Sequence, residues 1–320
     1  MGRMLLPLLW AACAIAAGLY AVEQHIPLAK AFAVLPAFLL EAAFYYALAR
    51  ERVRARLEKF SRAGIAVALT FAAVLPYSAA HLALGGFEWR GFWMVAALAG
   101  VASFWFAFLP PAPAADVFFL VFMAVVWISR ILRPYYPTLS RIPVEALLQL
   151  MWFRTGLFAM VVIRRVQNIG FGFWPRKREW MIGAMWFAIF LPAAAAAGEW
   201  MGFVGRPHLA AGWQRTTLLA IATFFGALWV LSLGEEFFFR GLLQQWMTRW
   251  LRNGWAGWIA ASLIFGACHL WFREFPNWRI AALAAILGLC CGAAFRATRS
   301  IRASMVTHSL AVTAWRVFFS

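Results

Sequence analysis

Charged residues are scarce in this chain of 320 residues. They make up 13% of it, whereas hydrophobic residues make up 65%. Soluble domains contain about 45–50% apolar and about 25% charged residues, so the composition excludes an ordinary soluble domain, and it is too apolar for a disordered chain. The four cysteines are too few for a disulfide scaffold. The apolar runs are long and unbroken, which excludes a barrel of short alternating strands.

Residues for several common hydrolytic sites are also missing. Asp116 is the only aspartate, so a catalytic aspartate pair is excluded. No histidine is followed by glutamate, which excludes a His-Glu-x-x-His zinc site. The sequence has no Gly-x-Ser-x-Gly nucleophile elbow either. Any hydrolytic chemistry would therefore need a different set of residues.

Long apolar segments recur along the whole chain. A helix needs about 20 apolar residues to cross the hydrocarbon core, so the sequence predicts an all-α, polytopic transmembrane helix bundle with about eight to eleven membrane helices. Glu145 and Arg154 interrupt the sixth segment, for which an interfacial helix is an alternative. The expected segments are 5–22, 31–49, 64–85, 92–110, 116–132, 143–163, 180–197, 216–250, 256–272, 279–296 and 301–319.

The net charge of +17 comes from 29 Lys and Arg residues against 12 Asp and Glu residues. The basic residues lie in short segments between apolar runs, which is typical of topology signals and of contact with anionic lipid. We therefore expect the lipid bilayer, and no nucleic acid, as a partner. The positive-inside rule places the basic loops 50–62 and 164–178 in the cytoplasm. The alanine-, tryptophan- and arginine-rich composition suggests a bacterial inner (plasma) membrane.

The late basic turns extend this topology. Arg249 and Arg252 mark one turn, and Arg296, Arg299 and Arg302 mark the next. The same rule places both turns in the cytoplasm and the C-terminus outside. Beyond about residue 175 polar residues become frequent inside apolar segments. We therefore divide the chain into an N-terminal transmembrane extension, 1–175, and a core, 176–320.

An adjacent acid pair lies in the over-long apolar segment, within Leu-Ser-Leu-Gly-Glu235-Glu236-Phe-Phe-Phe-Arg240-Gly-Leu-Leu-Gln. An ionised side chain at membrane depth costs a few kcal/mol or more, so such residues indicate function. Glu236 and Arg240 are four residues apart on a helix and can pair. This leaves Glu235 to act as a base. The alternative is a membrane-surface helix whose charged groups reach water.

Two histidines occur in later apolar segments. His269 lies as far after residue 252, the centre of a predicted helix–turn–helix, as Glu235 lies before it. At 1.5 Å per residue both should lie ~25 Å from the turn. His308 is expected in the final helix, ~12 Å from that depth by the same count. Taken singly, each histidine could instead be a helix–helix hydrogen-bonding contact.

A buried glutamate with two histidines permits two kinds of chemistry. Without metal, the glutamate deprotonates a water molecule, and the imidazoles orient that water and stabilise the oxyanion. With metal, Glu235, His269 and His308 could bind zinc. The residues alone do not decide between these routes.

At these residues the sequence resembles the CPBP family, the CAAX-protease and bacteriocin-processing membrane proteins that include Rce1-type endopeptidases. The family's Glu-Glu-x-x-x-Arg motif matches Glu235, Glu236 and Arg240. Its Phe-x-x-x-His motif matches Phe265 and His269. The resemblance covers about 176–320. A third motif begins with a histidine in the last conserved helix, which aligns with His308.

The resemblance implies a glutamate-dependent intramembrane peptidase that needs no cofactor and acts on a membrane-anchored protein or peptide. Glu235 would activate water, held by Glu236 and Arg240, while His269 would assist the water and His308 the oxyanion. The family usually has Asn or Asp where this chain has Val312; Ser309 or Thr313 could substitute. Val312 also supports an alternative, a non-catalytic scaffold or bacteriocin-immunity protein. A proton-coupled transporter would be expected to show an inverted repeat, and none is seen.

Overall fold

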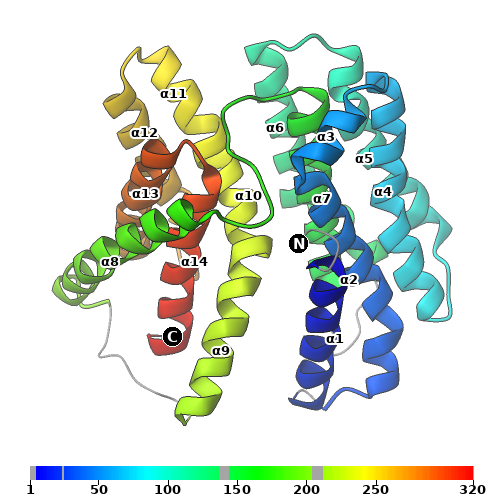
Figure 1. The fold of residues 1–320 in the computed structure, drawn as a ribbon, viewed down its shortest axis with the longest axis horizontal. Coiled ribbons are helices and arrows are strands. Elements are labelled where there is room, and N and C mark those ends of the chain that lie inside the picture. The colour runs from blue at the N-terminus through cyan, green and yellow to red at the C-terminus, as the bar shows by residue number, and fades with distance from the viewer. Residues whose placement is uncertain (1–4, 24, 137–143, 204–211, 320) are drawn as a thin grey trace. The chain divides into compact units, whose positions relative to one another are not determined.

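The computed structural model describes residues 5–23, 25–136, 144–203 and 212–319, and these contain helices and no strands. Figure 1 shows the resulting helices. The contacts divide the chain into two compact units, Met1–Gln167 and Asn168–Ser320. The all-α fold predicted from the sequence is therefore confirmed.

Each apolar segment expected from the sequence contains a helix in the described residues, and the last residues of 116–132 and 256–272 form turns. Among the described residues, seven helices are long and apolar enough to cross a membrane. Three shorter apolar helices, Pro7–Val22, Pro113–Ile128 and Gly254–Ala267, and the final helix account for the remaining expected segments. The chain is an integral, multi-pass membrane protein.

The first unit consists of helices from the expected N-terminal extension. Its elements are α1 (Leu5–Glu23), α2 (Leu28–Ala49), α3 (Glu51–Leu57), α4 (Arg62–Ala83), α5 (Trp89–Phe108), α6 (Pro113–Ile128), η1 (Arg133–Tyr135), α7 (Val144–Phe158) and its π-helical continuation η2 (Ala159–Ile163).

A buried ion pair joins α7 to α2 inside this unit. The Arg154 guanidinium donates to both carboxylate oxygens of Glu41, at 2.5 and 2.8 Å, and also to the carbonyl of Ala72 on α4. Arg154 is 0% exposed and Glu41 is 1% exposed. The pairing satisfies a charge that would otherwise be costly to bury. The segment Val144–Ile163 is long and apolar enough to cross a membrane, as the sequence predicts.

The second unit is built around one interrupted helix of 38 residues, Trp213–Trp250. That helix comprises α9 (Trp213–Gly226), η3 (Ala227–Ser232), α10 (Leu233–Glu236), η4 (Phe237–Gln244) and α11 (Gln245–Trp250), where η3 and η4 are π-helical. The other elements are α8 (Lys177–Trp200), α12 (Gly254–Ala267), α13 (Trp278–Thr298) and α14 (Ile301–Phe318).

Polar side chains fix where the last three helices begin. Asn253, Asn277 and Ser300 each accept a hydrogen bond from a backbone N–H in the first turn of α12, α13 and α14. Such caps satisfy donors that would otherwise have no partner at a helix start. They therefore set the position of each helix along the chain.

The boundary between the units falls at 167/168, whereas the sequence pattern indicated 175. The backbone of Ile169 accepts a hydrogen bond from the N–H of Ile301, and the carbonyl of Gly170 accepts one from the Ser300 hydroxyl. The loop after Gln167 is thus bonded to the start of α14. This bonding makes it part of the second unit.

Candidate active site

The acid pair occupies α10, a single α-helical turn between the two π-helical segments η3 and η4. Glu236 is 0% exposed and Arg240 is 1% exposed. Arg240 donates from Nη1 to Oε1 of Glu236 at 3.2 Å, and its Nε lies 3.2 Å from Oε2. The predicted i, i+4 pair is present. π-helical insertions often occur at functional sites.

Further hydrogen bonds join the helix that carries the Glu236–Arg240 ion pair to α13. Arg240 Nη2 donates to the carbonyl of Gly288 at 2.9 Å, and Gln244 Nε2 donates to that of Gly292 at 3.4 Å. Both acceptors belong to α13. A Cβ atom at Gly292 would overlap the Trp258 ring. The glycine thus permits the close approach that these contacts need.

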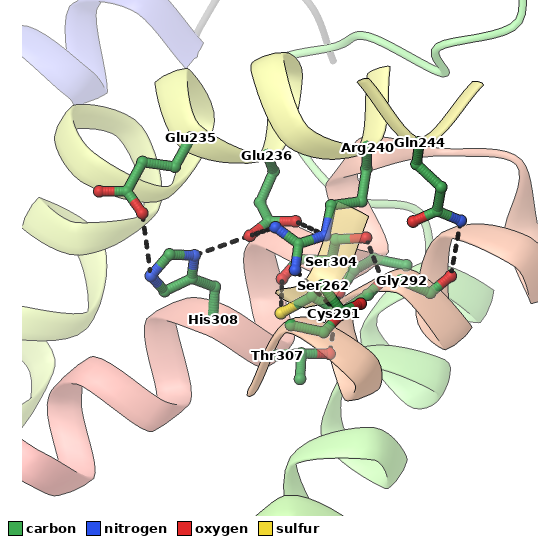
Figure 2. Close-up of polar contacts among 12 residues, drawn as sticks. Glu235, Glu236, Arg240, Gln244, Ser262, Cys291, Gly292, Ser304, Thr307 and His308 are labelled. Carbon is green, nitrogen blue, oxygen red and sulfur yellow. Dashed lines mark hydrogen bonds and ion pairs between the residues drawn. The ribbon is translucent and has the colours of Figure 1, made fainter. Parts of the chain in front are cut away.

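His308 lies between the two glutamates, as Figure 2 shows. Its Nδ1 lies 2.7 Å from Oε1 of Glu236, and its Nε2 lies 3.8 Å from Oε2 of Glu235. The imidazole is 3% exposed. One histidine from α14 therefore connects both acids of α10.

The position of His308 corrects the expected depth difference of ~12 Å. That count assumed that α14 begins level with the turn between α11 and α12. Gly241 instead packs beside Ile301, the first residue of α14. Glu235 lies six residues before Gly241, and His308 lies seven residues after Ile301. The two side chains therefore reach the same depth.

His269 follows the end of α12 rather than lying within it. Helix α12 ends at Ala267, and His269 lies in the turn that follows. Its Nδ1 lies 2.8 Å from the carbonyl oxygen of Phe265. A carbonyl only accepts hydrogen bonds, so Nδ1 carries the proton. In the neutral ring Nε2 then has a lone pair to offer.

The three predicted active groups line one cavity of about 320 Å³. Apart from Glu235, His269, His308 and Arg316, the side chains that line the cavity are apolar. The Phe265 ring separates the histidines, with centroids 4.8 Å from His269 and 5.7 Å from His308. The structure thus brings together all five predicted site residues and Phe265. Small cavities with a few convergent polar groups are typical of ligand sites.

Val312 also lines this cavity, at the position where the resembling family usually has Asn or Asp. The two suggested substitutes do not line it. The hydroxyl of Ser309 is 2.9 Å from that of Ser232, and Thr313 donates to the carbonyl of Ser309. Neither hydroxyl is therefore placed to replace the missing side chain.

The sequence suggested Glu235, His269 and His308 as possible zinc ligands, but a different set of residues brings its potential ligand atoms close together. Among the described residues, atoms of Glu236, Cys291 and His308 lie within 4.8 Å of one another, and all three residues are buried. Arg240 already bonds the same carboxylate. A metal cation there would face the guanidinium charge, which disfavours it.

The sequence did not single out the α13 residues that support the acid pair. Gly288 and Gly292 act through backbone carbonyls, and Cys291 packs beside Glu236. The available signal was the Gly-x-x-x-Gly spacing of Gly288 and Gly292, which permits close helix packing.

Comparison with known families addresses this same region. Residues 216–314 match the family model described as type II CAAX prenyl endopeptidase Rce1-like. This region is Rce1-like. The match confirms the resemblance to the CPBP family over a shorter segment than 176–320, and that segment contains all five candidate residues of the site.

The description of that family model names endopeptidases. Comparisons with curated proteins and with solved structures gave no match.

Proposed function

We propose that this protein is an intramembrane endopeptidase of the CAAX-protease-like type. It hydrolyses a peptide bond of a membrane-tethered protein or peptide, such as a sorting signal, leader or C-terminal tail. The observation that carries the proposal is the convergence of Glu235, His269 and His308 on one apolar cavity. Glu235 is the base, and Glu236 and Arg240 are positioning residues.

The contacts of His308 indicate which of its nitrogen atoms faces each glutamate. Because Arg240 already donates to Glu236, we assign the Nδ1 proton of His308 to the hydrogen bond with Glu236, which turns Nε2 toward Glu235. The carboxylates of Glu235 and Glu236 and the guanidinium of Arg240 together leave one negative charge. A proton held between Glu235 and Nε2 of His308, in addition to the proton on Nδ1, offsets that charge. Burial of an uncompensated charge is costly. The cluster is therefore suited to move one proton at Glu235.

The reaction then follows from these positions. Glu235 takes a proton from water, with His269 Nε2 accepting a hydrogen bond from the same water, and the oxygen attacks the peptide carbonyl carbon. The tetrahedral oxyanion is stabilised by a proton on His308 Nε2. Glu235 returns its proton to the leaving nitrogen as the C–N bond breaks, which yields a carboxylic acid and an amine.

The non-catalytic alternative rests on Val312. The side chain at this position is apolar and lines the cavity, so one donor for the oxyanion is missing. A scaffold or bacteriocin-immunity protein with the same fold would hold a peptide in this cavity and leave it uncut. Replacement of Glu235 would then have no effect on the ends of any membrane protein.

Two substitutions test the proposal. We expect Glu235→Ala and His269→Ala each to abolish processing of a membrane substrate, because they remove the base and its partner. Both proteins should still insert and fold. Glu199→Gln, an exposed acid at the end of α8, is the matched control and should process normally. Full complementation of a deletion strain by both alanine variants would contradict the proposal.

We also propose that the protein acts without a metal, in a bacterial inner membrane. Processing should persist in strong chelator, because the Glu236 carboxylate is held by Arg240 and His308 rather than by a cation. Loss of processing in chelator, with recovery on added zinc, would favour the metal route.

A further inference from the structure

The cavity at the candidate site occupies one half of the second unit. The helices of this unit run between an end that carries the turn 251–253 and the opposite end, where α8 and α14 finish and α13 starts. Figure 1 shows the α11–α12 turn and the C-terminus at opposite ends of this unit. We name these the turn end and the C-terminal end.

Every helix that lines the cavity contributes its half nearer the C-terminal end. α8 contributes from Phe190 onward, α13 contributes from Ile280 to Leu287, and α14 contributes from His308 onward. The interrupted helix contributes only Leu231 and Glu235. The catalytic groups therefore form the inner end of a cavity that extends toward the C-terminal end.

The opposite direction is closed by packed side chains. Glu236, Arg240 and Gln244 are at most 3% exposed and bond to each other or to α13. In the same region, the Ser304 hydroxyl on α14 donates to the carbonyl of Cys291 on α13 at 2.8 Å, and both residues are fully buried. Among the described residues of this unit, packed side chains thus close the turn end, and the cavity beside Glu235 extends toward the C-terminal end.

Charge identifies which side of the membrane this is. Basic side chains gather at the turn end: Arg176, Lys177, Arg178, Arg249, Arg252, Arg296, Arg299 and Arg302. Glu179 is the acid there, and it pairs with Arg302 at 2.7 Å. The described residues of the C-terminal end carry fewer basic side chains, namely Arg215, Arg273, Arg279 and Arg316, together with Glu199 and Glu274. By the positive-inside rule the turn end is cytoplasmic.

We infer that the active-site cavity opens to the non-cytoplasmic side of the membrane. On the proposed function, the occupant is an apolar juxtamembrane segment of an anchored polypeptide that enters from that side. The walls suit such a segment, because Ala194, Ala284 and Ala314 leave room for large apolar side chains. The scissile bond would lie below that leaflet's surface, at the level of Glu235.

Cysteine labelling tests the side of access directly. The background carries Cys13→Ala, Cys268→Ala and Cys290→Ala and keeps the fully buried Cys291. The probe position is Ala314→Cys in the cavity wall. A membrane-impermeant maleimide is applied to intact cells and to cells with opened membranes.

Two exposed positions serve as controls: Gln214→Cys at the start of α9 and Arg252→Cys in the cytoplasmic turn. We expect Ala314→Cys to be labelled in intact cells, as is Gln214→Cys. Arg252→Cys should be labelled only after the membrane is opened. Absence of labelling at Ala314→Cys in intact cells, or labelling of Arg252→Cys there, would overturn the inference.

The labelling does not depend on catalysis, so it should be unchanged in a Glu235→Gln background. An inactive protein that is still labelled from outside would contradict the proposed function and leave the side of access established. For an active protein, new termini that depend on Glu235 should lie on the non-cytoplasmic side of their substrates. Termini on the cytoplasmic side would overturn the inference.

Discussion

At the scale of single residues, the site depends on charges that are buried together. Glu236 receives hydrogen bonds from Arg240 and His308, and His308 extends the connection to Glu235. Each group compensates the charge of its neighbour, and Glu236, Arg240 and His308 are buried. Removal of Glu236 or Arg240, which are both fully buried, therefore affects folding as well as chemistry.

Arg240→Ala should lower the free energy of unfolding by about 3–5 kcal/mol, because it leaves the Glu236 carboxylate buried without its main counter-charge. The measurement is thermal unfolding in detergent. Arg249→Ala, which removes an exposed arginine nine residues nearer the helix end, is the control and should change little. Equal stability of the two variants would contradict the assigned role of Arg240.

Sequence reasoning succeeded for residues whose partner lies close by in the chain. The Glu236–Arg240 pair follows from helical spacing alone. The approach of His308 does not, because it depends on where α14 starts relative to Gly241, a tertiary contact. The spacing of Gly288 and Gly292 indicates close helix packing, but it does not identify the side chains that donate to their carbonyl groups.

At the scale of elements, glycines set how closely the helices of the second unit approach. A Cβ atom at Gly292 would overlap Trp258 and lie near the amide of Gln244. The side chain of Trp258 is itself held, because its indole N–H donates to the carbonyl of Leu289 at 2.9 Å. The contact has little room to adjust.

Gly292→Ala should therefore destabilise the protein by about 1–3 kcal/mol through overpacking. Gly226→Ala is the matched control, because it is also helical and a Cβ atom there meets nothing within 4 Å. The control should be neutral or slightly stabilising. Thermal unfolding of both variants in detergent checks the prediction. An equal unfolding temperature for Gly292→Ala and Gly226→Ala would contradict it.

The first unit has its own buried ion pair, Glu41 with Arg154. Arg154→Met should destabilise that unit by about 3–5 kcal/mol, since it leaves an unpaired buried carboxylate. Adding Glu41→Leu should restore much of the loss, because an apolar pair of similar volume is often as stable as the buried ions. The measurement is a double-mutant cycle of unfolding in detergent.

An exposed pair in the same unit provides the control for this cycle. Arg133 and Glu145 are 48% and 42% exposed, so Arg133→Ala should cost at most about 1 kcal/mol. If the double variant remains as unstable as Arg154→Met, the lost stability does not come from the unpaired charge.

At the scale of the whole molecule, composition was enough to predict the fold class. With 65% hydrophobic residues in long runs, only helices could satisfy the backbone inside a membrane. The exact division into units could not be predicted, because the residues after Gln167 join the second unit through backbone hydrogen bonds to Ser300 and Ile301.

The central claim is that Glu235 activates water to cut membrane-anchored polypeptides. The most direct measurement compares the termini of membrane proteins in cells that carry the wild-type chain or Glu235→Gln at equal abundance. We predict that a defined set of internal termini near membrane segments disappears in the variant and that the uncut precursors accumulate. Identical termini in the two strains would contradict the claim.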